Sequence, residues 1–391
     1  MEKIIKAAVE RGASDLHIKA GDVFRARIDG RLVPLTRQAL TPDQTKAIAL
    51  RLIPNEEDRG RVDELCDYDC SWGAPGIGRF RVNILRQRSS FMIVMRVIPF
   101  EVPTFEQLRL PPVLSDIARC ERGMVLVTGV TGSGKTNTMA ALVNQINATM
   151  NKHIVTLENP IEFLHRDLKS SVTQREIGVD TPDFKMGLRA ALRQDPDVIL
   201  IGEMRDAETI DTAMKAAETG HLLVSTLHTP DALTTVVRIM AMFSPEEQGI
   251  VRTRLAESLC AVVSQRLLPR KDSTGRVVAA EVLMVTPTIR DLILEGERVT
   301  EIRDHMAEGR EQYGSQTFDQ HLAELVNAGE VSFEVAMANA SRPSDFALQM
   351  RTFGGGNGGA RPPSGPGDGG GAPPPPALDG ATLSGFDFEG T

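Results

Sequence analysis

Residues 129–136 constrain the fold more than any other stretch of the chain. They read Gly-Val-Thr-Gly-Ser-Gly-Lys-Thr and fill every position of the phosphate-binding pattern G-x-x-x-x-G-K-[ST]. Such a loop requires a strand before it and a helix after it. Residues 124–128 form the apolar run of a buried parallel strand, and apolar residues after the loop recur at helical spacing. The sequence therefore predicts an α/β fold with a nucleoside triphosphate site at this turn.

The chemistry of the loop assigns a role to each kind of residue in it. Glycines let the backbone turn tightly around phosphates, while exposed N–H groups and the helix N-terminus attract negative charge. Lys135 adds a positive charge near the β- and γ-phosphates, and the Thr136 hydroxyl is a ligand for Mg²⁺. The predicted nucleotide contacts are Gly129, Val130, Thr131, Gly132, Ser133, Gly134, Lys135, Thr136 and Asn137.

Net charge and hydropathy limit the classes of partner. With a formal charge of −8 over 391 residues, the chain has no general basic surface, which argues against a nucleic-acid translocase. No run approaches the roughly 18 apolar residues of a membrane-spanning helix, and residues 1–6 lack the apolar core of a signal peptide. We therefore expect a cytoplasmic protein of about two domains.

The cysteines give no sign of a metal site. Cys66, Cys70, Cys120 and Cys260 are scattered along the chain without a C-x-x-C pair. This spacing suggests neither a disulfide framework nor a four-thiolate zinc site. We expect reduced thiols in the core.

The order of patterns along the chain predicts five segments. Strand-like and helix-like stretches, including a hairpin over residues 23–35, indicate a small N-terminal α/β domain with its own sheet. Prolines mark a linker after it, and alternating strands and helices then indicate a mostly parallel sheet with helices on both faces. Beyond Arg238 the chain is expected to be mostly helical, with helices over 245–268, 288–294, 318–328 and 333–340. The expected segments are the N-terminal domain 1–98, the linker 99–113, the nucleotide-binding core 114–286, the helical region 287–350 and a disordered Gly- and Pro-rich tail 351–391.

Acidic side chains follow two predicted strands of the core. Glu158 ends the strand 153–158 and Glu162 comes shortly after it, while Glu203 follows the strand 198–201. Ligands of open α/β sheets gather at the carboxyl ends of the strands. These acids are therefore candidates to hold Mg²⁺ or to polarise the attacking water, with solvated surface glutamates as the alternative.

Two histidines bracket the strand over residues 222–227. His221 stands at its start and His228 at its end, where it would lie beside the nucleotide. His228 is a candidate to sense the phosphate, with a structural hydrogen bond as the alternative, and the same two interpretations stay open for His221. No cysteine or histidine cluster accompanies them, so neither is expected to bind a metal.

Four sequence boxes stand in the order found in one family. Over residues 3–345 the chain resembles the PilT-type twitching-motility ATPases of the type IV pilus, within the secretion-ATPase superfamily. The boxes are the phosphate loop 129–136, the acidic box 156–163 (TLENPIEF), the second acidic strand 195–206 and the histidine box 217–229.

This resemblance implies a RecA-like P-loop ATPase domain preceded by a smaller PAS-like domain. It also implies a cytoplasmic homohexamer that hydrolyses ATP with Mg²⁺, each nucleotide lying between an N-terminal domain and an ATPase domain. Hydrolysis would rotate the domains and drive pilus retraction. The implied partners are the inner-membrane pilus platform protein and the pilus machinery at the cytoplasmic face, with no nucleic acid.

The resemblance also implies roles for single residues. Arg81 and Arg96, on the last strands of the first domain, match arginines that reach the phosphates. Arginines supplied from a mobile domain neutralise charge on the transferred phosphoryl group and couple closure to hydrolysis; solvated arginines on edge strands are the alternative. The other matches are Glu203 as the catalytic glutamate, Glu162 as an acid supporting Mg²⁺ or water, Glu158 near Mg²⁺ through water, Thr136 on Mg²⁺, and His228 and Arg238 as nucleotide-responsive positions.

The chain departs from the family pattern in three places. Asn159 replaces the usual Asp of the acidic box, which weakens a metal role at that position. Residues 288–295 (TIRDLILE) differ at two polar positions from the retraction signature A-I-R-N-L-I-R-E, and this favours an accessory retraction ATPase of the PilU type, beside a paralogous ATPase, as an alternative. The Gly- and Pro-rich tail has no counterpart in the pattern.

Other functions remain as alternatives. An assembly or type II secretion ATPase would share the four boxes but usually carries an additional N-terminal domain and often a tetracysteine zinc module, which this sequence lacks. A nucleotide-binding scaffold without turnover is disfavoured by the intact Lys135, Thr136 and Glu203. A helicase or packaging motor ranks last because it needs a basic groove for nucleic acid.

Overall fold

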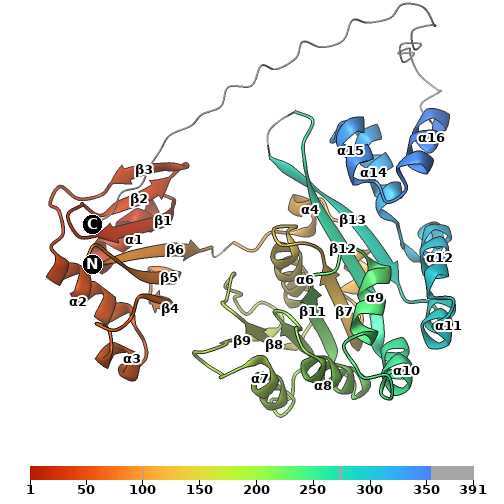
Figure 1. Cartoon of the computed structure of the whole chain (residues 1–391), viewed down its shortest axis with the longest axis horizontal. Helices are drawn as coiled ribbons and strands as arrows, with labels where there is room; N and C mark the ends of the chain where they lie inside the picture. The colour runs from red at the N-terminus through yellow and green to blue at the C-terminus, as the bar shows by residue number, and fades with distance from the viewer. Residues whose placement is uncertain (100, 273–274, 354–391) are drawn as a thin grey trace, which may run out of the picture. The chain divides into compact units, whose positions relative to one another are not determined.

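The computed structural model describes residues 1–99, 101–272 and 275–353. In this part of the chain, strands form two separate sheets, each with its own helices (Figure 1). The expected α/β class is therefore confirmed. No helix in the described ranges combines the length and apolar character needed to cross a bilayer.

The first sheet has six antiparallel strands in the order β3-β2-β1-β6-β5-β4. Buried and more exposed residues alternate along β5 and β6, as expected for a sheet with one covered face. On that face Phe80, Val82 and Met95 cluster with Ile5 of α1 and Leu52 of α2. The elements are α1 (Glu2–Glu10), β1 (Ala13–Lys19), β2 (Arg25–Ile28), β3 (Arg31–Pro34), α2 (Pro42–Leu52), α3 (Glu56–Gly60), β4 (Asp67–Ala74), β5 (Gly78–Gln87) and β6 (Ser90–Ile98).

The second sheet has seven strands in the order β13-β12-β7-β11-β10-β8-β9. All neighbours pair in parallel except β12 and β13, which form an antiparallel edge. Every residue of β7, β10 and β11 is buried, which is typical of parallel strands covered by helices on both faces. The strands are β7 (Gly123–Thr128), β8 (His153–Glu158), β9 (Ser171–Glu176), β10 (Val198–Ile201), β11 (Leu222–Leu227), β12 (Leu259–Pro269) and β13 (Arg276–Met284).

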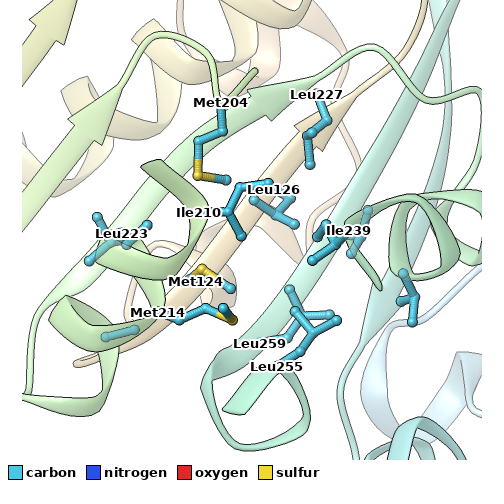
Figure 2. Close-up of a cluster of buried hydrophobic side chains, with 14 of the residues drawn as sticks. Met124, Leu126, Met204, Ile210, Met214, Leu223, Leu227, Ile239, Leu255 and Leu259 are labelled. Carbon is cyan, nitrogen blue, oxygen red and sulfur yellow. The ribbon is translucent and has the colours of Figure 1, made fainter. Parts of the chain in front are cut away.

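The two faces of this sheet carry two hydrophobic clusters. Successive residues of β7 point to opposite faces, so Met124 and Leu126 belong to one cluster and Val125 and Val127 to the other. The first cluster includes side chains of α7 to α10, and Figure 2 shows Ile210, Met214, Ile239 and Leu255 gathered around the strands. The second includes side chains of α6. The helices are α6 (Lys135–Thr149), α7 (Phe184–Ala191), α8 (Ala207–Glu218), α9 (Ala232–Met240) and α10 (Gln248–Ser258).

The helix expected over residues 245–268 is wrong in its second half. α10 ends at Ser258, and the backbone turns extended at Leu259, where β12 begins. β12 pairs with β7 along one edge and with β13 along the other, and its residues 261–265 are all buried. A fully buried strand shows a continuous apolar run without period-2 alternation, and such a run cannot be told from a buried helix by periodicity alone.

Short helices complete the described chain. Within the expected linker 99–113, α4 (Phe105–Leu108) begins at a Thr104 capping box, and Phe105 and Leu110 are buried in the same cluster as α6. The helices expected over 288–294, 318–328 and 333–340 are present. The remaining elements are α5 (Leu114–Ile117), α11 (Pro287–Glu295), η1 (Val299–Glu301), α12 (Ile302–Glu308), α13 (Arg310–Tyr313), α14 (Phe318–Asn327), α15 (Phe333–Asn339) and α16 (Pro343–Phe353). The expected tail spans residues 351–391. Residues 351–353 belong to α16, and residues 354–391 lie outside the described residues.

The cysteines differ from the expected core thiols. Cys66 is exposed, and Cys70, Cys120 and Cys260 are partly buried. All four are free. The core expectation is wrong for Cys66, whereas Cys70, Cys120 and Cys260 pack against the hydrophobic clusters without being fully buried.

Candidate functional site

The phosphate loop connects β7 to α6, as the sequence predicts. Gly129 has φ +141°, and a Cβ there would lie 2.5 Å from the Gln265 carbonyl oxygen of β12 and from the Ser133 hydroxyl. Gly134, with φ +93°, is the N-cap of α6. Because both positions need a positive φ, which residues with a Cβ rarely adopt, glycine is required for this path of the backbone.

Lys135 is the first residue of α6 and is only 9% exposed. Its Nζ donates to the carbonyl oxygens of Gly129 at 2.8 Å and Val130 at 3.1 Å. Burial lowers the pKa of Lys135, and the charge of Glu203 opposes that shift. The ammonium group is therefore held over the loop and interacts electrostatically with Glu203, which follows β10.

A cavity of about 450 Å³ opens at the carboxyl ends of the parallel strands. This is the edge of an open α/β sheet where ligands bind. The loop, β8, β10 and β11 all contribute to its wall. Of the residues that the sequence singled out, those lining it are Thr131, Gly132, Gly134, Lys135, Thr136, Asn137, Glu158, Glu162, Glu203 and His228.

Glu203 stands one residue beyond Gly202, directly after β10, with its side chain 18% exposed. Its Oε1 lies 2.7 Å from an Arg205 nitrogen, and its Oε2 lies 3.6 Å from His228 Nε2. The Thr226 hydroxyl donates to the Gly202 carbonyl at 2.7 Å and so joins the ends of β10 and β11. These contacts aim the carboxylate into the cavity from a fixed backbone.

Glu158 is more enclosed than Glu203. Its Oε1 accepts hydrogen bonds from the Thr156 hydroxyl at 2.6 Å and from Gln174 Nε2 at 3.0 Å. Burial raises its pKa, which the two hydrogen bonds partly counter. Glu162 lies on the exposed side of the same cavity. The two acids thus differ in solvation, and Glu162 is the freer to change its contacts.

The donor set suits a hard cation. The Thr136 hydroxyl and the carboxylates of Glu158, Glu162 and Glu203 line one cavity, and oxygen donors of this kind, completed by phosphate oxygens and water, are those that Mg²⁺ prefers. Within the described ranges no cluster of three or more His, Cys, Asp or Glu side chains forms a metal cage by itself. The residues therefore fit a Mg²⁺ ion that a nucleotide helps to hold.

The cavity residues that the sequence analysis missed include one histidine and two residues of β12 and β13. His165 lies on the segment after the acidic box, where burial lowers its pKa to about 4, and in the described structure its Nδ1 has no hydrogen-bond partner. Leu267 of β12 and Arg276 of β13 line the cavity beside the loop. Recognition of the β12 and β13 hairpin would have placed Leu267 and Arg276 there; no pattern in the sequence pointed to His165.

Six of the predicted site residues do not line the cavity: Gly129, Val130 and Ser133 of the phosphate loop, and Arg81, Arg96 and Arg238. Arg81 and Arg96 are exposed and lie opposite each other in the register of β5 and β6, and Arg96 Nε lies 2.9 Å from Asp15 Oδ1. Arg238 is exposed near the end of α9. Their roles remain predictions.

Comparisons with known proteins find secretion-system and type IV pilus proteins as relatives. A family model described as Type II/IV secretion system protein matches residues 1–338. The type IV pilus ATPase PilU of Pseudomonas aeruginosa is 41% identical over 350 residues, covering 90% of this chain and 91% of that protein. The type IV pilus retraction ATPase PilT of the same organism is 42% identical over 344 residues, covering 88% and 99%.

A solved structure agrees with these sequence relatives. The crystal structure of the pilus retraction motor PilT with bound ADP superposes with a TM-score of 0.79 at 41% identity, covering 88% of this chain and 98% of that one. The fold, the four boxes and the sequence matches all point the same way. The chain belongs to the Type II/IV secretion system protein family, and within it to the PilT-type secretion ATPases.

Proposed function

We propose that this chain is a motor ATPase that hydrolyses Mg-ATP and drives retraction of a type IV pilus. The observation that carries the proposal is that Lys135, at the start of α6, and Glu203, after β10, line one cavity. A cation for the phosphates and a carboxylate for the attacking water are the two charged groups that phosphoryl transfer to water needs. The PilT structure with bound ADP supports a nucleotide in this cavity.

The loop binds and orients the triphosphate. Backbone N–H groups of residues 131–136 and the N-terminus of α6 provide positive potential for the β- and γ-phosphates. Lys135 would exchange its carbonyl partners for phosphate oxygens, because a charged acceptor forms the stronger hydrogen bond. Asn137 and Thr131 at the cavity wall complete the contacts.

Thr136 would hold Mg²⁺ directly, and Glu158 and Glu162 would hold it through water. When bound, the ion supplies neutralising charge to the β- and γ-phosphate oxygens. Because the Glu158 carboxylate already accepts two side-chain hydrogen bonds, it is better suited to orient a water than to enter the coordination shell.

Glu203 would accept a proton from the water that attacks the γ-phosphate. Arg205 and His228 bracket its carboxylate and restrict its rotation. His228 stands between Glu203 and the end of β11, so it is placed to respond when the γ-phosphate leaves. General-base catalysis by such a group contributes on the order of a hundredfold to ten thousandfold to the rate.

We further propose that the motor is a homohexamer at the cytoplasmic face of the inner membrane, acting on the pilus platform protein. Arg81 and Arg96 would reach the phosphates when an N-terminal domain closes on a nucleotide, and Arg238 would respond to its hydrolysis. The exposure of Arg96 supports this role: its Nε pairs with Asp15, but 71% of its side chain is exposed and available to a further partner.

An accessory motor of the PilU kind is the second candidate. The chain is as similar to PilU as to PilT, at 41% and 42% identity. In addition, Leu294 on α11 replaces a polar position of the retraction signature and is 38% exposed. The two identities do not separate the candidates, and the changed signature position favours a motor that works beside a paralogous ATPase.

Retraction of fluorescent pili in the chain's own host tests the proposal. Cells without the chromosomal copy would carry wild type, Glu203→Gln or the exposed control Glu246→Gln. We expect wild type and the control to restore retraction and Glu203→Gln to fail. Abolished retraction in the deletion strain supports a principal motor, while retraction that persists only at low load supports the accessory one. Unchanged retraction under load in the deletion strain would refute both.

A further inference from the structure

Two cysteines meet at the edge of the second sheet that lies opposite the nucleotide cavity. Cys120 lies in the turn between α5 and the start of β7, and Cys260 is the second residue of β12. Both line one cavity of about 450 Å³ at the amino ends of these strands. They are 140 positions apart in sequence, so no spacing pattern links them.

A bulge in β12 directs Cys260 toward this turn. Leu259 pairs with Met124 and Ala261 with Val125, which leaves Cys260 as the additional residue. Its Sγ donates to the Arg122 carbonyl at 3.0 Å. A Cβ at Gly123, which has φ +110°, would lie 2.3 Å from that sulfur. The backbone is thus built around the Cys260 thiol.

The two thiols line the same cavity and lie close enough for each to shift the pKa of the other. The interaction between the two thiols is the largest influence on both groups: it lowers the pKa of Cys260 and raises the pKa of Cys120. Burial opposes the shift at Cys260, and the charges of Arg122 and Arg290 reinforce it. Cys260 is therefore the cysteine of the pair that loses its proton more readily, and Cys120 is the thiol beside it.

We propose that Cys120 and Cys260 are a reversible oxidation site at which a hydroperoxide converts the pair into a disulfide. The Cys260 thiolate attacks one peroxide oxygen, the O–O bond breaks, and the other oxygen leaves as water or an alcohol after taking a proton. The Cys120 sulfur then attacks the Cys260 sulfenic acid. The S–S bond forms, the S–O bond breaks, and the hydroxyl leaves with the Cys120 proton as water.

The cavity and its charges fit this chemistry. Arg122 and Arg290 line it and stabilise both the thiolate and the oxyanion that leaves the peroxide. Disulfides in reducing compartments are usually transient and redox-sensing, which suits a thiol pair that is free in the reduced chain. A disulfide here would join the turn before β7 to β12. β7 leads into the phosphate loop, and β12 carries Leu267 of the nucleotide cavity.

Peroxide oxidation of the full chain tests the site. A Cys66→Ser, Cys70→Ser variant keeps only the pair, and it would be treated with hydrogen peroxide, digested without reductant and analysed by mass spectrometry. We expect a cross-linked peptide holding both cysteines, reversed by dithiothreitol, and a melting temperature raised by several degrees because the bond closes a long loop.

Single variants in the same background assign the roles. With Cys120→Ser, peroxide should leave a sulfenic acid on Cys260 that dimedone traps. With Cys260→Ser, Cys120 should react at least about tenfold more slowly, because burial and the charge of Asp116 still raise its pKa. The proposal is overturned if the pair yields no cross-link while Cys66 of the wild type is oxidised. Equal reaction rates of Cys120 and Cys260 would overturn the assigned roles.

Discussion

At the scale of single residues, Lys135 and Glu203 face one cavity but are held differently. Lys135 is bonded to loop carbonyls, which phosphates would replace, whereas Glu203 is held by Arg205 and His228 at the end of β10. We expect Lys135→Ala to weaken binding of a fluorescent nucleotide analogue by about tenfold or more, because a charged hydrogen bond is lost. Glu203→Gln should bind as wild type does. Equal weakening in both variants would contradict the separate roles.

Glu281 of β13 should make stability depend on pH. It is 1% exposed, and its Oε1 accepts from the backbone N–H of Ala232 at the start of α9. Burial raises its pKa to about 7. A raised pKa in the folded state stabilises the fold at low pH and loses that contribution as pH rises through about 4.5 to 7, on the order of 3 kcal/mol in all.

Glu281→Gln keeps the acceptor for Ala232 and removes the ionisation. We therefore expect its melting temperature to change less than that of wild type as the pH rises from about 5 to 8, and to exceed it at the upper end. Glu257→Gln, at an exposed position of α10, is the control. Parallel pH curves for Glu281→Gln and wild type would contradict the buried carboxyl.

At the scale of elements, the side of the cavity formed by the phosphate loop was predictable from the sequence, whereas the side formed by β12 and β13 was not. The loop pattern predicts a strand before it and a helix after it. An acid that follows a buried strand is predicted to lie at the carboxyl edge of the sheet, beside the loop, and Glu203 does line the cavity there. Residues 261–265 of β12 are all buried and show no alternation, so the sequence pattern predicts a helix over residues 259–268. For this reason the sequence did not predict that Leu267 and Arg276 line the cavity.

The path of the phosphate loop should depend on Gly129. A Cβ there meets the Gln265 carbonyl at 2.5 Å, whereas one at Gly178 in the turn after β9 has no atom within 4 Å. Both have positive φ, so Gly178→Ala carries the backbone strain alone, on the order of 1 kcal/mol. We expect Gly129→Ala to lower the melting temperature further than this control and to abolish nucleotide binding. Equal melting temperatures and retained binding would contradict the close approach.

At the scale of the whole molecule, the account requires the N-terminal domain to contribute to hydrolysis. Arg96 pairs with Asp15, but this pair is largely exposed on the arginine side and contributes little to stability. We expect Arg96→Ala to fold and to bind nucleotide yet to hydrolyse it at least about tenfold more slowly, because charge on the phosphoryl group is less neutralised. Asp15→Asn weakens the same ion pair but keeps the arginine and should retain normal turnover. If the two variants lose turnover equally, the ion pair rather than the arginine is what matters.

ATP turnover and assembly of this chain can be followed in one experiment. Steady-state Mg-ATP hydrolysis by wild type and Glu203→Gln would be recorded together with molecular mass from light scattering during nucleotide addition. The account predicts turnover by a particle of about six protomers, reduced at least about a hundredfold in the variant. A monomer or dimer without turnover, or undiminished turnover in Glu203→Gln, would contradict it.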